Sequence, residues 1–418
     1  MKKIFILGAS ALQVPAIKKA KEKGLYVYAL DYDPEAVGIA DADEFLCIST
    51  IDKEAVLEAA KKYEPDYIIT STSDMPVRTV AWVNEQLGRK NDISYENAIC
   101  ATDKAAMRRR MKEKGVPIPE FYVASDEIEF MYAMHQLGDR FVCKPADNAA
   151  SRGVVLIDKK ELIEKAGGEE GLDDELLKIY TYSKKYSRSG EVLLEEFMEG
   201  PEVSVESFTI EGKTHIITIT DKMVTEIPFF VETGHTEPSR LPQDVREDIM
   251  RVAEAAINAV GIVNGPSHTE IKVTKNGAKL VEIAARLGGD FITSKLVPLS
   301  TGVDLIDCCL SSTLGEEVKW QTSKNAGSAI RFLFAKGEAE SAGDSKDMII
   351  SSVEGAADAE RMPGVTEVVI YKKPGDKATN LTNSGDRWGH VIAEGESAED
   401  AAKKAEDAAS RIRFILEQ

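Results

Sequence analysis

The 418-residue sequence lacks any long run of apolar residues and any excess of positive charge. No stretch approaches the roughly 18 consecutive apolar residues that a membrane span requires. Lys and Arg number 52 against 71 Asp and Glu, which gives a net charge of −19. A field of this sign repels phosphate backbones and anionic headgroups. We therefore expect neither a nucleic acid nor a membrane as a partner.

Cysteine is scarce as well, and the five cysteines form no CxxC pair. An odd number scattered over this length excludes a disulfide-stapled scaffold and fits a reducing compartment. The start of the chain, Met1-Lys2-Lys3, leads into a short strand-like run rather than the apolar segment of a signal peptide. These features predict a cytoplasmic protein with reduced cysteines.

Several catalytic motifs are missing too. The sequence contains no GxSxG nucleophile elbow, no Walker GxxxxGK[ST] and no protein-kinase HRD and DFG set. Its five histidines include no pair with the HxxxH or HxH spacing of a zinc site. These absences argue against elbow-type hydrolases, P-loop nucleotidases and protein kinases.

The first hundred residues alternate short apolar runs with amphipathic stretches, which predicts a parallel, doubly wound α/β sheet. Gly8-Ala9-Ser10 follows the first expected strand and Asp31 ends the second, as in dinucleotide-binding folds. The later glycines of GxGxxG are absent, so a packing turn is the favoured interpretation. A nicotinamide-dependent oxidoreductase remains the distant alternative. We expect strands at 4–7, 26–30, 45–48 and 67–69, and helices at 15–22 and 53–62.

Beyond residue 102 the pattern changes to α+β, beginning with a basic helix from Lys104 to Lys114 that Asp103 caps. Asn276-Gly277 predicts a hairpin turn between strands at 269–273 and 279–283. We assign no element to the charged segment 161–190. The other expected elements are strands at 141–145, 154–157, 192–195, 203–210, 215–220, 328–334, 364–371 and 389–394, and helices at 245–260 and 398–416.

Lys144 is a cation inside an apolar strand, which is costly unless an anion meets it. A buried phosphate is one such partner, and Lys104 on the basic helix could reach the same group. A loop of small residues, 146–153, follows, and its backbone N–H groups could fold over a γ-phosphate. A snorkelled lysine and a plain hairpin are the alternatives. The loop includes Ser151, Arg152 and Gly153.

The segment from Glu195 to Glu202 joins two expected strands and mixes apolar residues with acids. Such a hinge, containing Glu195, Glu196 and Phe197, could pair its backbone with an adenine edge and place Phe197 near the base. Glu202 would then meet the ribose hydroxyls. The alternative is a strand-turn-strand with solvated carboxylates.

Glu270 and Glu282 lie on the two strands of the predicted hairpin, six residues before and five after the turn. They should fall nearly opposite each other, which is unfavourable without a cation between them. Mg²⁺ held by these carboxylates and by phosphate oxygens fits that need. Arg286 follows at once, with a surface salt bridge as its alternative role, and His235 stands in a polar loop.

At this point the sequence resembles the ATP-grasp carboxylate-amine ligases over essentially its whole length. The segments that carry the resemblance are TDKAAMRRRMKEKGVPIP, FVCKP, LLEEFMEGPEVSVE, ETGHTEPS and HTEIKV followed by LVEIAARLGGD. Within the family the chain is most similar to bacterial L-amino-acid ligases that make dipeptides, beside the biotin carboxylase, glycinamide ribonucleotide synthetase and carbamoyl-phosphate synthase group. The resemblance implies a pre-grasp α/β domain at 1–102, an ATP-grasp domain at 103–320 with a mobile lid at about 117–195, and a C-terminal α+β domain at 321–418.

The resemblance also implies a role for each candidate residue. Where many members have Asn for a second metal, this chain has Ala284, so the number of metal ions stays open. The implied roles are Lys104 and Lys144 on the α- and β-phosphates, the 146–153 loop over the γ-phosphate, Glu195 and Phe197 at the adenine, Glu202 at the ribose, Glu270 and Glu282 on the metal, Arg286 on the acyl phosphate, and His235 near the phosphorylated group.

The expected activity is phosphorylation of a carboxylate by ATP, followed by attack of an amine on the acyl phosphate. A closed site with a metal ion and a guanidinium would stabilise the charge that develops. We expect ATP and Mg²⁺ as cofactors, with Mn²⁺ as an alternative metal, a small carboxylate and an amine as substrates, and a homodimer. A glycinamide ribonucleotide synthetase-like or carbamoyl-phosphate synthase-like ligase is the competing interpretation.

Overall fold

The computed structural model describes residues 1–147, 153–225, 230–335 and 348–417. The chain forms two compact units, which we treat separately. Unit 1 comprises Met1–Ile118, Ser204–Ile219 and Gln243–Ser323, and unit 2 comprises Pro119–Val203, Thr220–Pro242 and Lys324–Gln418. The predicted domain boundaries near residues 102 and 320 stay predictions.

Unit 1 begins with a four-stranded parallel sheet, as the alternating pattern predicts. Its strand order is β3-β2-β1-β4. Apolar side chains of the strands and of α2 and α3 form one core, which includes Phe5, Leu30 and Val56. The elements are β1 (Lys3–Leu7), α1 (Val14–Glu22), β2 (Tyr26–Asp31), β3 (Glu44–Cys47), α2 (Lys53–Tyr63), β4 (Tyr67–Thr70) and α3 (Met75–Gln86).

The turn after β1 supports the packing interpretation. Asp31 accepts hydrogen bonds from the backbone N–H groups of Ala9, at 2.8 Å, and Asp33, at 3.1 Å. Gly8 has a φ of 110°, and a Cβ there would come within 3.1 Å of the Gln13 side chain. One carboxylate oxygen of Asp31 therefore binds the backbone of the turn after β1, and the other binds the backbone just after β2.

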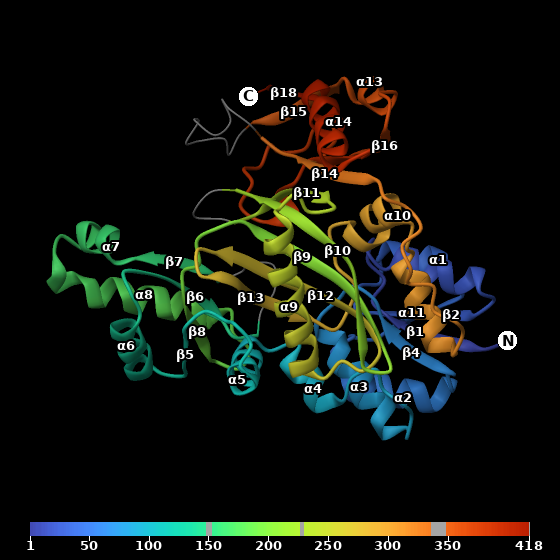
Figure 1. Ribbon diagram of the computed structural model, residues 1–418, viewed down its shortest axis with the longest axis horizontal. Helices are drawn as coiled ribbons and strands as arrows, with labels where there is room; N and C mark the ends of the chain where they lie inside the picture. Colours follow the sequence, from blue (N-terminus) through green and yellow to red (C-terminus); the bar gives the residue numbers. More distant parts are fainter. Residues whose placement is uncertain (148–152, 226–229, 336–347, 418) are drawn as a thin grey trace. The chain divides into compact units, whose positions relative to one another are not determined.

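In the rest of unit 1, the predicted hairpin packs against a long helix. Helix α9 (Gln243–Val260) packs on β12 (Gly265–Thr274) and β13 (Gly277–Ala284), and the strand order continues from β13 through β12 and β9 to β10 (Figure 1). Asp248 of α9 accepts a 2.8 Å hydrogen bond from the Ala278 N–H just after the turn. The remaining elements are η1 (Val37–Asp41), α4 (Tyr95–Cys100), α5 (Lys104–Lys114), η3 (Ile292–Leu296), α10 (Val297–Thr301) and α11 (Leu305–Leu314).

Strands β9 (Glu202–Ile210) and β10 (Lys213–Val224) pass along the chain from one unit into the other. Unit 2 contains an antiparallel sheet of order β5-β8-β6-β7 with three helices beside it (Figure 1). Phe130, Phe141 and Tyr180 belong to its core. The elements are β5 (Phe121–Ala124), α6 (Glu127–Gln136), β6 (Arg140–Pro145), β7 (Val155–Asp158), α7 (Lys159–Ala166), η2 (Glu169–Gly171), α8 (Leu172–Lys185) and β8 (Val192–Glu196).

Helices α7 and α8 occupy much of the segment 161–190, for which no element was predicted. Asp158 caps α7, and Gly167, with a φ of 78°, ends it. Leu176, Tyr180 and Ser183 recur at helical spacing on the buried face of α8. The many charged residues of this segment belong to solvent-facing sides and hide that periodicity.

The rest of unit 2 continues the strand order from β10 through β11, β14 and β17 to β16, with α14 against β14 and β17 (Figure 1). The helix expected at 398–416 ends at Arg411, and the alternating Arg413–Glu417 segment forms β18, which pairs with β15. The elements are β11 (Glu232–Glu237), β14 (Gly327–Leu333), β15 (Ile349–Glu354), α13 (Ala356–Glu360), β16 (Val365–Ile370), η5 (Ser384–Asp386), β17 (Gly389–Gly395), α14 (Ala398–Arg411) and β18 (Arg413–Glu417).

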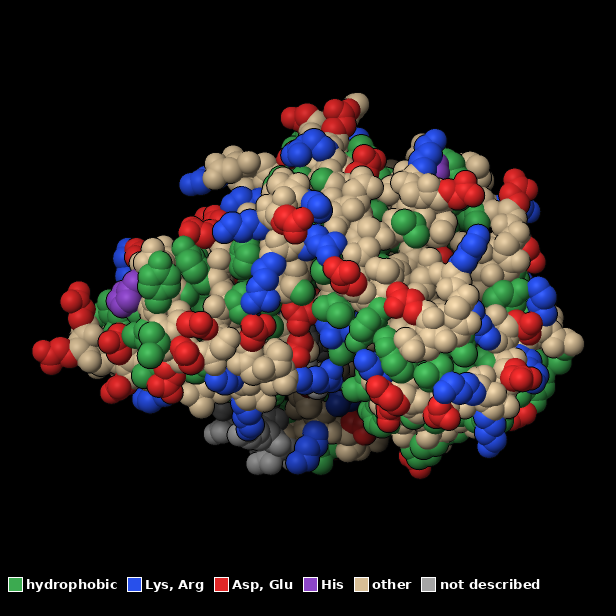
Figure 2. Space-filling model, turned by 90° about the horizontal axis from the view of Figure 1, so that it is seen from below, with side chains coloured by type: hydrophobic (Ala, Val, Ile, Leu, Met, Phe, Trp, Pro, Cys, Tyr) green, Lys and Arg blue, Asp and Glu red, His purple; other side chains and the backbone are tan. Residues whose placement is uncertain are grey.

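The surface bears charges of both signs. On the face seen in Figure 2, Lys and Arg side chains are interspersed with Asp and Glu rather than gathered into one basic patch. Within the described residues, none of the helices combines the length and the apolar character that crossing a membrane requires.

Candidate functional site

The β12–β13 hairpin brings Glu270 and Glu282 directly opposite each other, as predicted. Ile271 pairs with Leu280, whereas Glu270 pairs with Glu282, so Val281 is the extra residue of a bulge in β13. Without this extra residue Glu270 would pair with Val281, so the bulge brings the two carboxylates into register. Two carboxylates side by side on one ladder repel each other and favour a cation between them.

Lys104 supplies a positive charge to this pair in the structure. Its Nζ lies 2.9 Å from Glu282 Oε1, and Arg108 of the same helix donates a 2.7 Å hydrogen bond to the Val281 carbonyl. Asp103 caps the helix through the Ala106 N–H, as predicted. Burial alone would lower the pKa of Lys104, but Glu282, Asp74 and Glu270 together raise it. Lys104 is therefore held as a cation beside the carboxylates.

Arg286 is fixed from an unexpected direction, by the loop that follows β4. Its Nε donates to Asp74 Oδ1 at 2.6 Å, and the Leu287 N–H donates to the Ser71 carbonyl at 2.9 Å. Burial opposes ionisation of Asp74, yet the Arg286 guanidinium outweighs it and lowers the pKa of this carboxyl group. The Arg286 side chain is only 15% exposed, so its ion pair is not the surface salt bridge that was the alternative.

Sequence reasoning missed two further residues next to this cluster. His268 Nδ1 lies 2.5 Å from Glu206 Oε1, and His268 Nε2 lies 3.5 Å from Glu270 Oε1. Burial alone would lower the pKa of His268, but the charge and the hydrogen bond of Glu206 raise it to about 9. Glu206 alternates with Ser204 and Glu202 on β9, and this period of two is the signal that could have found it.

Unit 2 holds the second group of predicted residues. Lys144 Nζ lies 2.5 Å from Glu195 Oε2, and the two residues are only 9% and 4% exposed. The anion that a buried lysine requires is therefore a carboxylate on the neighbouring strand β8. A second anion such as a phosphate would find a lysine that is already desolvated and fixed in position.

The expected adenine hinge begins at the end of β8, whose last two residues are Glu195 and Glu196. Glu196 accepts a hydrogen bond from the Glu120 N–H at 3.2 Å. The Arg140 guanidinium lies 4.5 Å from the centre of the Phe197 ring, and the Phe230 ring centre lies 6.3 Å from the Phe197 ring centre. Phe197 therefore has both a cation and a second aromatic ring as neighbours.

A chain of ion pairs begins at Glu202, the predicted ribose residue. Lys222 Nζ lies 2.6 Å from Glu202 Oε1 and 3.6 Å from Glu232 Oε1. Arg387 Nη2 donates to the Glu232 carbonyl at 3.0 Å, and its guanidinium lies 3.6 Å from the ring centre of Phe332. Glu202 is thus not the solvated carboxylate of the alternative interpretation.

The placement of His235 in a polar loop is wrong. His235 lies in β11, between β10 and β14, and is 1% exposed. Arg331 donates a 3.0 Å hydrogen bond to its carbonyl, and its ring packs edge-on against Phe332. The polar composition of Glu232–Glu237 concealed a central strand, because neighbouring charged and aromatic groups satisfy its buried side chains.

The predicted phosphate loop is only partly described. Ser151 and Arg152 lie outside the described residues. Gly153 has a φ of 79°, and a Cβ there would come within 2.8 Å of the Pro145 side chain. Ser183 of α8 donates a 2.8 Å hydrogen bond to the Gly153 carbonyl. The described end of the loop is therefore fixed to the helix and requires glycine.

The residues that could hold a metal are two carboxylates and not a complete cage. Among the described residues, no three His, Cys, Asp or Glu side chains converge on one point. Ala284 is buried opposite His268 and offers no ligand atom. Mg²⁺ commonly takes one or two protein carboxylates and completes its shell with phosphate oxygens and water. Glu270 and Glu282 fit that arrangement.

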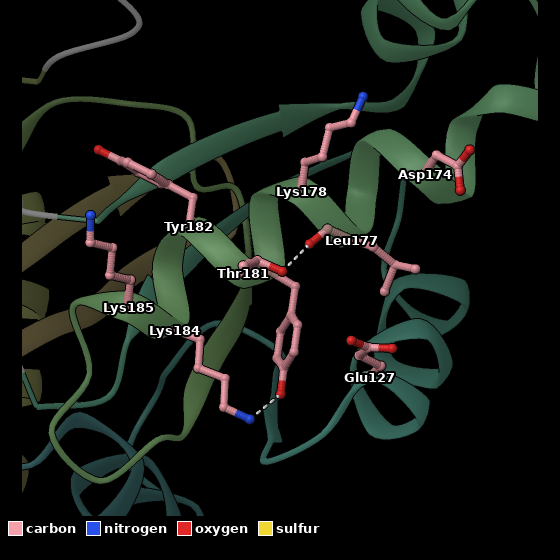
Figure 3. A pocket seen from close by; sticks show the side chains of 9 residues that line it. Glu127, Asp174, Leu177, Lys178, Thr181, Tyr182, Lys184 and Lys185 are labelled. Carbon is pink, nitrogen blue, oxygen red and sulfur yellow. Dashed lines mark hydrogen bonds between the residues drawn. The ribbon is translucent and has the colours of Figure 1, made fainter.

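A surface pocket of about 870 Å³ lies elsewhere in unit 2. Glu127 comes from α6, and the other lining side chains come from α8, where Lys184 donates to Tyr180 and Thr181 to the Leu177 carbonyl (Figure 3). None of the predicted site residues lines this pocket, so it forms no part of the candidate site.

The sequence is similar to those of known ligases. Alanine–anticapsin ligase of Bacillus subtilis is 28% identical over 295 residues, covering 67% of this chain and 61% of the relative, so the chain spans less than two thirds of that ligase's length. Phosphoribosylamine–glycine ligase of Methanococcus vannielii is 23% identical over 433 residues, covering 97% of this chain and 93% of the relative.

Among solved structures, an L-amino acid ligase from Bacillus licheniformis superimposes with a TM-score of 0.80 at 19% identity, covering 100% of this chain and 99% of that one. Residues 137–294 match the ATP-grasp domain family, and residues 349–417 match L-amino acid ligase C-terminal domain 2. The two matches together place an ATP-grasp domain before an L-amino acid ligase C-terminal domain in one chain.

Proposed function

We propose that this protein is an ATP- and Mg²⁺-dependent ligase that joins a small carboxylate to an amine, with an amino acid as the carboxylate. The carboxylate oxygen takes the γ-phosphoryl group, ADP leaves, and the amine then attacks the acyl carbon and expels phosphate. The observation that carries the proposal is the occurrence, in one chain, of the ATP-grasp match and the L-amino acid ligase C-terminal match.

The charged residues of unit 1 have the chemistry that this reaction needs. In the proposal Glu270 and Glu282 hold Mg²⁺, and the bound ion neutralises phosphate charge. Lys104 binds a phosphate oxygen, which it can do because it is already held as a cation. Arg286, oriented by Asp74, stabilises the acyl phosphate through its planar fork of N–H donors.

The remaining predicted residues, which lie in unit 2, bind the nucleotide in this proposal. Lys144 binds phosphate, and the hinge with Glu195, Glu196 and Phe197 receives adenine. Glu202 binds the ribose. His235 is buried in β11, so its proposed effect on the phosphorylated group acts through the position of that strand. Ser151, Arg152 and Gly153 cover the γ-phosphate.

Finer features of the proposal concern the metal, the assembly and the compartment. Mn²⁺ should support the reaction in place of Mg²⁺, because carboxylate and phosphate oxygens are also good ligands for Mn²⁺. We also propose a homodimer and a cytoplasmic location, the latter because the cysteines form no CxxC pair and the described free cysteines are mostly buried.

A second candidate is a ligase acting on a phosphoribosylamine and glycine. The observation that favours it is the near-complete length match with the phosphoribosylamine–glycine ligase. The C-terminal domain match favours the amino-acid ligase instead.

A substrate screen separates the two candidates. Purified full-length protein is incubated with ATP, Mg²⁺ and all pairs of the common amino acids, or with phosphoribosylamine and glycine, and phosphate release is measured. Mass spectrometry then identifies the product. We expect a dipeptide from at least one pair and little phosphate from ATP alone. Equal phosphate release with every addition, and no condensed product, contradicts the proposal.

A further inference from the structure

A buried carboxylate and a histidine stand directly behind one of the proposed metal ligands. Glu206 on β9 and His268 on the adjacent strand β12 are 1% and 6% exposed. Their closest atoms, Glu206 Oε1 and His268 Nδ1, are 2.5 Å apart. The other ring nitrogen, Nε2, faces Glu270 Oε1 at 3.5 Å. The imidazole therefore links two carboxylates, one of which belongs to the candidate metal site.

The backbone after Arg286 closes over this pair. A Cβ at Gly288 would come within 2.8 Å of His268 Nδ1 and 2.9 Å of both Glu206 oxygens. Only glycine fits at this position, so the backbone lies directly against the imidazole and the carboxylate. The geometry of Glu206 and His268 is thus set from β9, β12 and the 286–289 segment together.

Packing alone does not account for a carboxylate at this position. Glu206 Oε2 is buried and has no hydrogen-bond partner within the part of the chain that the structure describes. A buried acceptor left without a donor is unfavourable for folding. An apolar side chain of similar size at this position would destabilise the folded protein less. We therefore infer that the negative charge of Glu206 has a role.

We propose that Glu206 and His268 are positioning residues that hold the Glu270 carboxylate in its metal-binding orientation. The inference rests on the proposed function, since it takes Glu270 as a metal ligand. The His268 ring lies between the two carboxylates, with Nδ1 at Glu206 and Nε2 towards Glu270, so His268 restrains Glu270 while Glu206 restrains His268. Groups behind a first ligand commonly alter metal affinity 10- to 100-fold because they fix its direction.

The test measures metal binding directly, with Mn²⁺ as the probe. Electron paramagnetic resonance counts free Mn²⁺ during titration of the full-length protein in the presence of ADP. We expect the Kd for Mn²⁺ to rise about 10- to 100-fold in Glu206→Gln and in His268→Ala. His268→Gln, whose amide can still donate to one carboxylate, should recover part of that loss. The Kd for ADP without metal should stay within about twofold of wild type, because neither residue is assigned to the nucleotide.

Ser207→Ala is the matched control. Ser207 is the neighbour of Glu206 on β9, and its hydroxyl pairs with Ser267, the neighbour of His268 on β12. The change removes a buried polar contact between the same two strands without touching the carboxylates. Its Kd for Mn²⁺ should equal that of the wild type, while thermal melting reports any loss of stability.

Two results overturn the inference. One is a Kd for Mn²⁺ within twofold of wild type in both Glu206→Gln and His268→Ala. The other is a parallel loss of melting temperature and metal-free ADP binding, which would reveal a merely structural role. Glu270→Gln separates this inference from the proposed function. If Glu270→Gln binds Mn²⁺ normally, the metal site itself is wrong; if only Glu270→Gln weakens binding, the positioning role alone fails.

Discussion

The cluster around Glu282 in unit 1 and the Lys144–Glu195 pair in unit 2 are held in different ways. Around Glu282, the side chains come from α5, the β4–α3 loop, β9, β12 and the segment after β13, so distant parts of the sequence build the cluster. In unit 2, Lys144 and Glu195 come from two adjacent strands of one small sheet. The first cluster therefore depends on tertiary packing, and the second on local strand register.

This difference predicts how substitutions act. A change in the unit 1 cluster alters several partners at once, because each cation there faces more than one carboxylate. A change at Lys144 removes the cation that contacts Glu195 on the adjacent strand. A second substitution in the partner residue should therefore restore stability for the Lys144–Glu195 pair of unit 2. It should not do so for the cluster around Glu282 in unit 1.

The largest effect is expected for Arg286→Ala. If the guanidinium stabilises the acyl phosphate, kcat should fall about 10²- to 10³-fold while the KM for ATP changes by only a few-fold. Asp74→Asn, which keeps the guanidinium but loosens it, should cause a smaller loss. Steady-state kinetics with the best substrate pair measure both, and a raised KM with an unchanged kcat would refute the assignment.

The next effect concerns Lys144→Met, which should raise the Kd for ATP about 10- to 100-fold through loss of a charge-assisted hydrogen bond. It should also lower stability by about 3–5 kcal/mol, because Glu195 stays buried without its cation. Isothermal titration calorimetry and urea unfolding measure the two quantities.

The double variant Lys144→Met/Glu195→Gln should recover most of the stability but none of the ATP affinity. If the double variant recovers both stability and ATP affinity, Lys144 only stabilises the sheet and does not bind ATP. If it recovers neither, the pair depends on more of unit 2 than the local register, and the contrast between the two units is wrong.

A smaller effect tests how tertiary contacts hold the metal hairpin. The hydrogen bond from the Ala278 N–H, followed by Arg251, lowers the pKa of Asp248. A lowered pKa in the folded state stabilises the protein above the unfolded value of about 3.9, and this contribution disappears as the pH falls through the folded value. Asp248→Asn should cost about 1 kcal/mol at pH 7. Urea unfolding from pH 7 to pH 3 should show the gap to wild type closing; a constant gap contradicts the account.

The smallest effect is a difference in thiol reactivity. Burial raises the pKa of Cys143 to about 12, whereas Cys47 is exposed. A thiol reagent at pH 8 should label Cys47 about 10²-fold faster than Cys143, because the thiolate is the reactive form and Cys143 must first become accessible. Peptide mass spectrometry of timed samples measures both rates. Comparable rates would show that the β5–β8 sheet opens readily.

Short-range patterns predicted most of the fold and the two carboxylates. The turn signal at Asn276-Gly277 placed Glu270 and Glu282 near each other on one hairpin. The loop residues are in fact Lys275 and Asn276, and the bulge at Val281 is what brings the two carboxylates into register. Helix 104–114 was evident from its Asp103 cap and its Gly115 stop, whose φ is 70°. These features involve residues close together in the chain.

The missed features depend on contacts between distant residues. Asp74 could not be paired with Arg286 from spacing alone, and Glu206 is far in sequence from His268. His235 was placed in a loop because the sequence around it is polar, and its contacts with Arg331 and Phe332 come from a strand that lies about 95 residues further along the chain. Ala284 was noted from the sequence, but the restraint of Glu270 by His268 required the folded strands.

Conversion of the carboxylate into an acyl phosphate can be followed by the transfer of ¹⁸O from the carboxylate to phosphate. The carboxylic acid that most stimulates phosphate release is labelled with ¹⁸O and incubated with ATP, Mg²⁺ and the amine. We expect one ¹⁸O atom in each released phosphate, because the carboxylate oxygen that bonds to phosphorus leaves as part of the phosphate when the amine attacks the acyl carbon. Phosphate that carries oxygen from water, with none from the carboxylate, would contradict the proposed function.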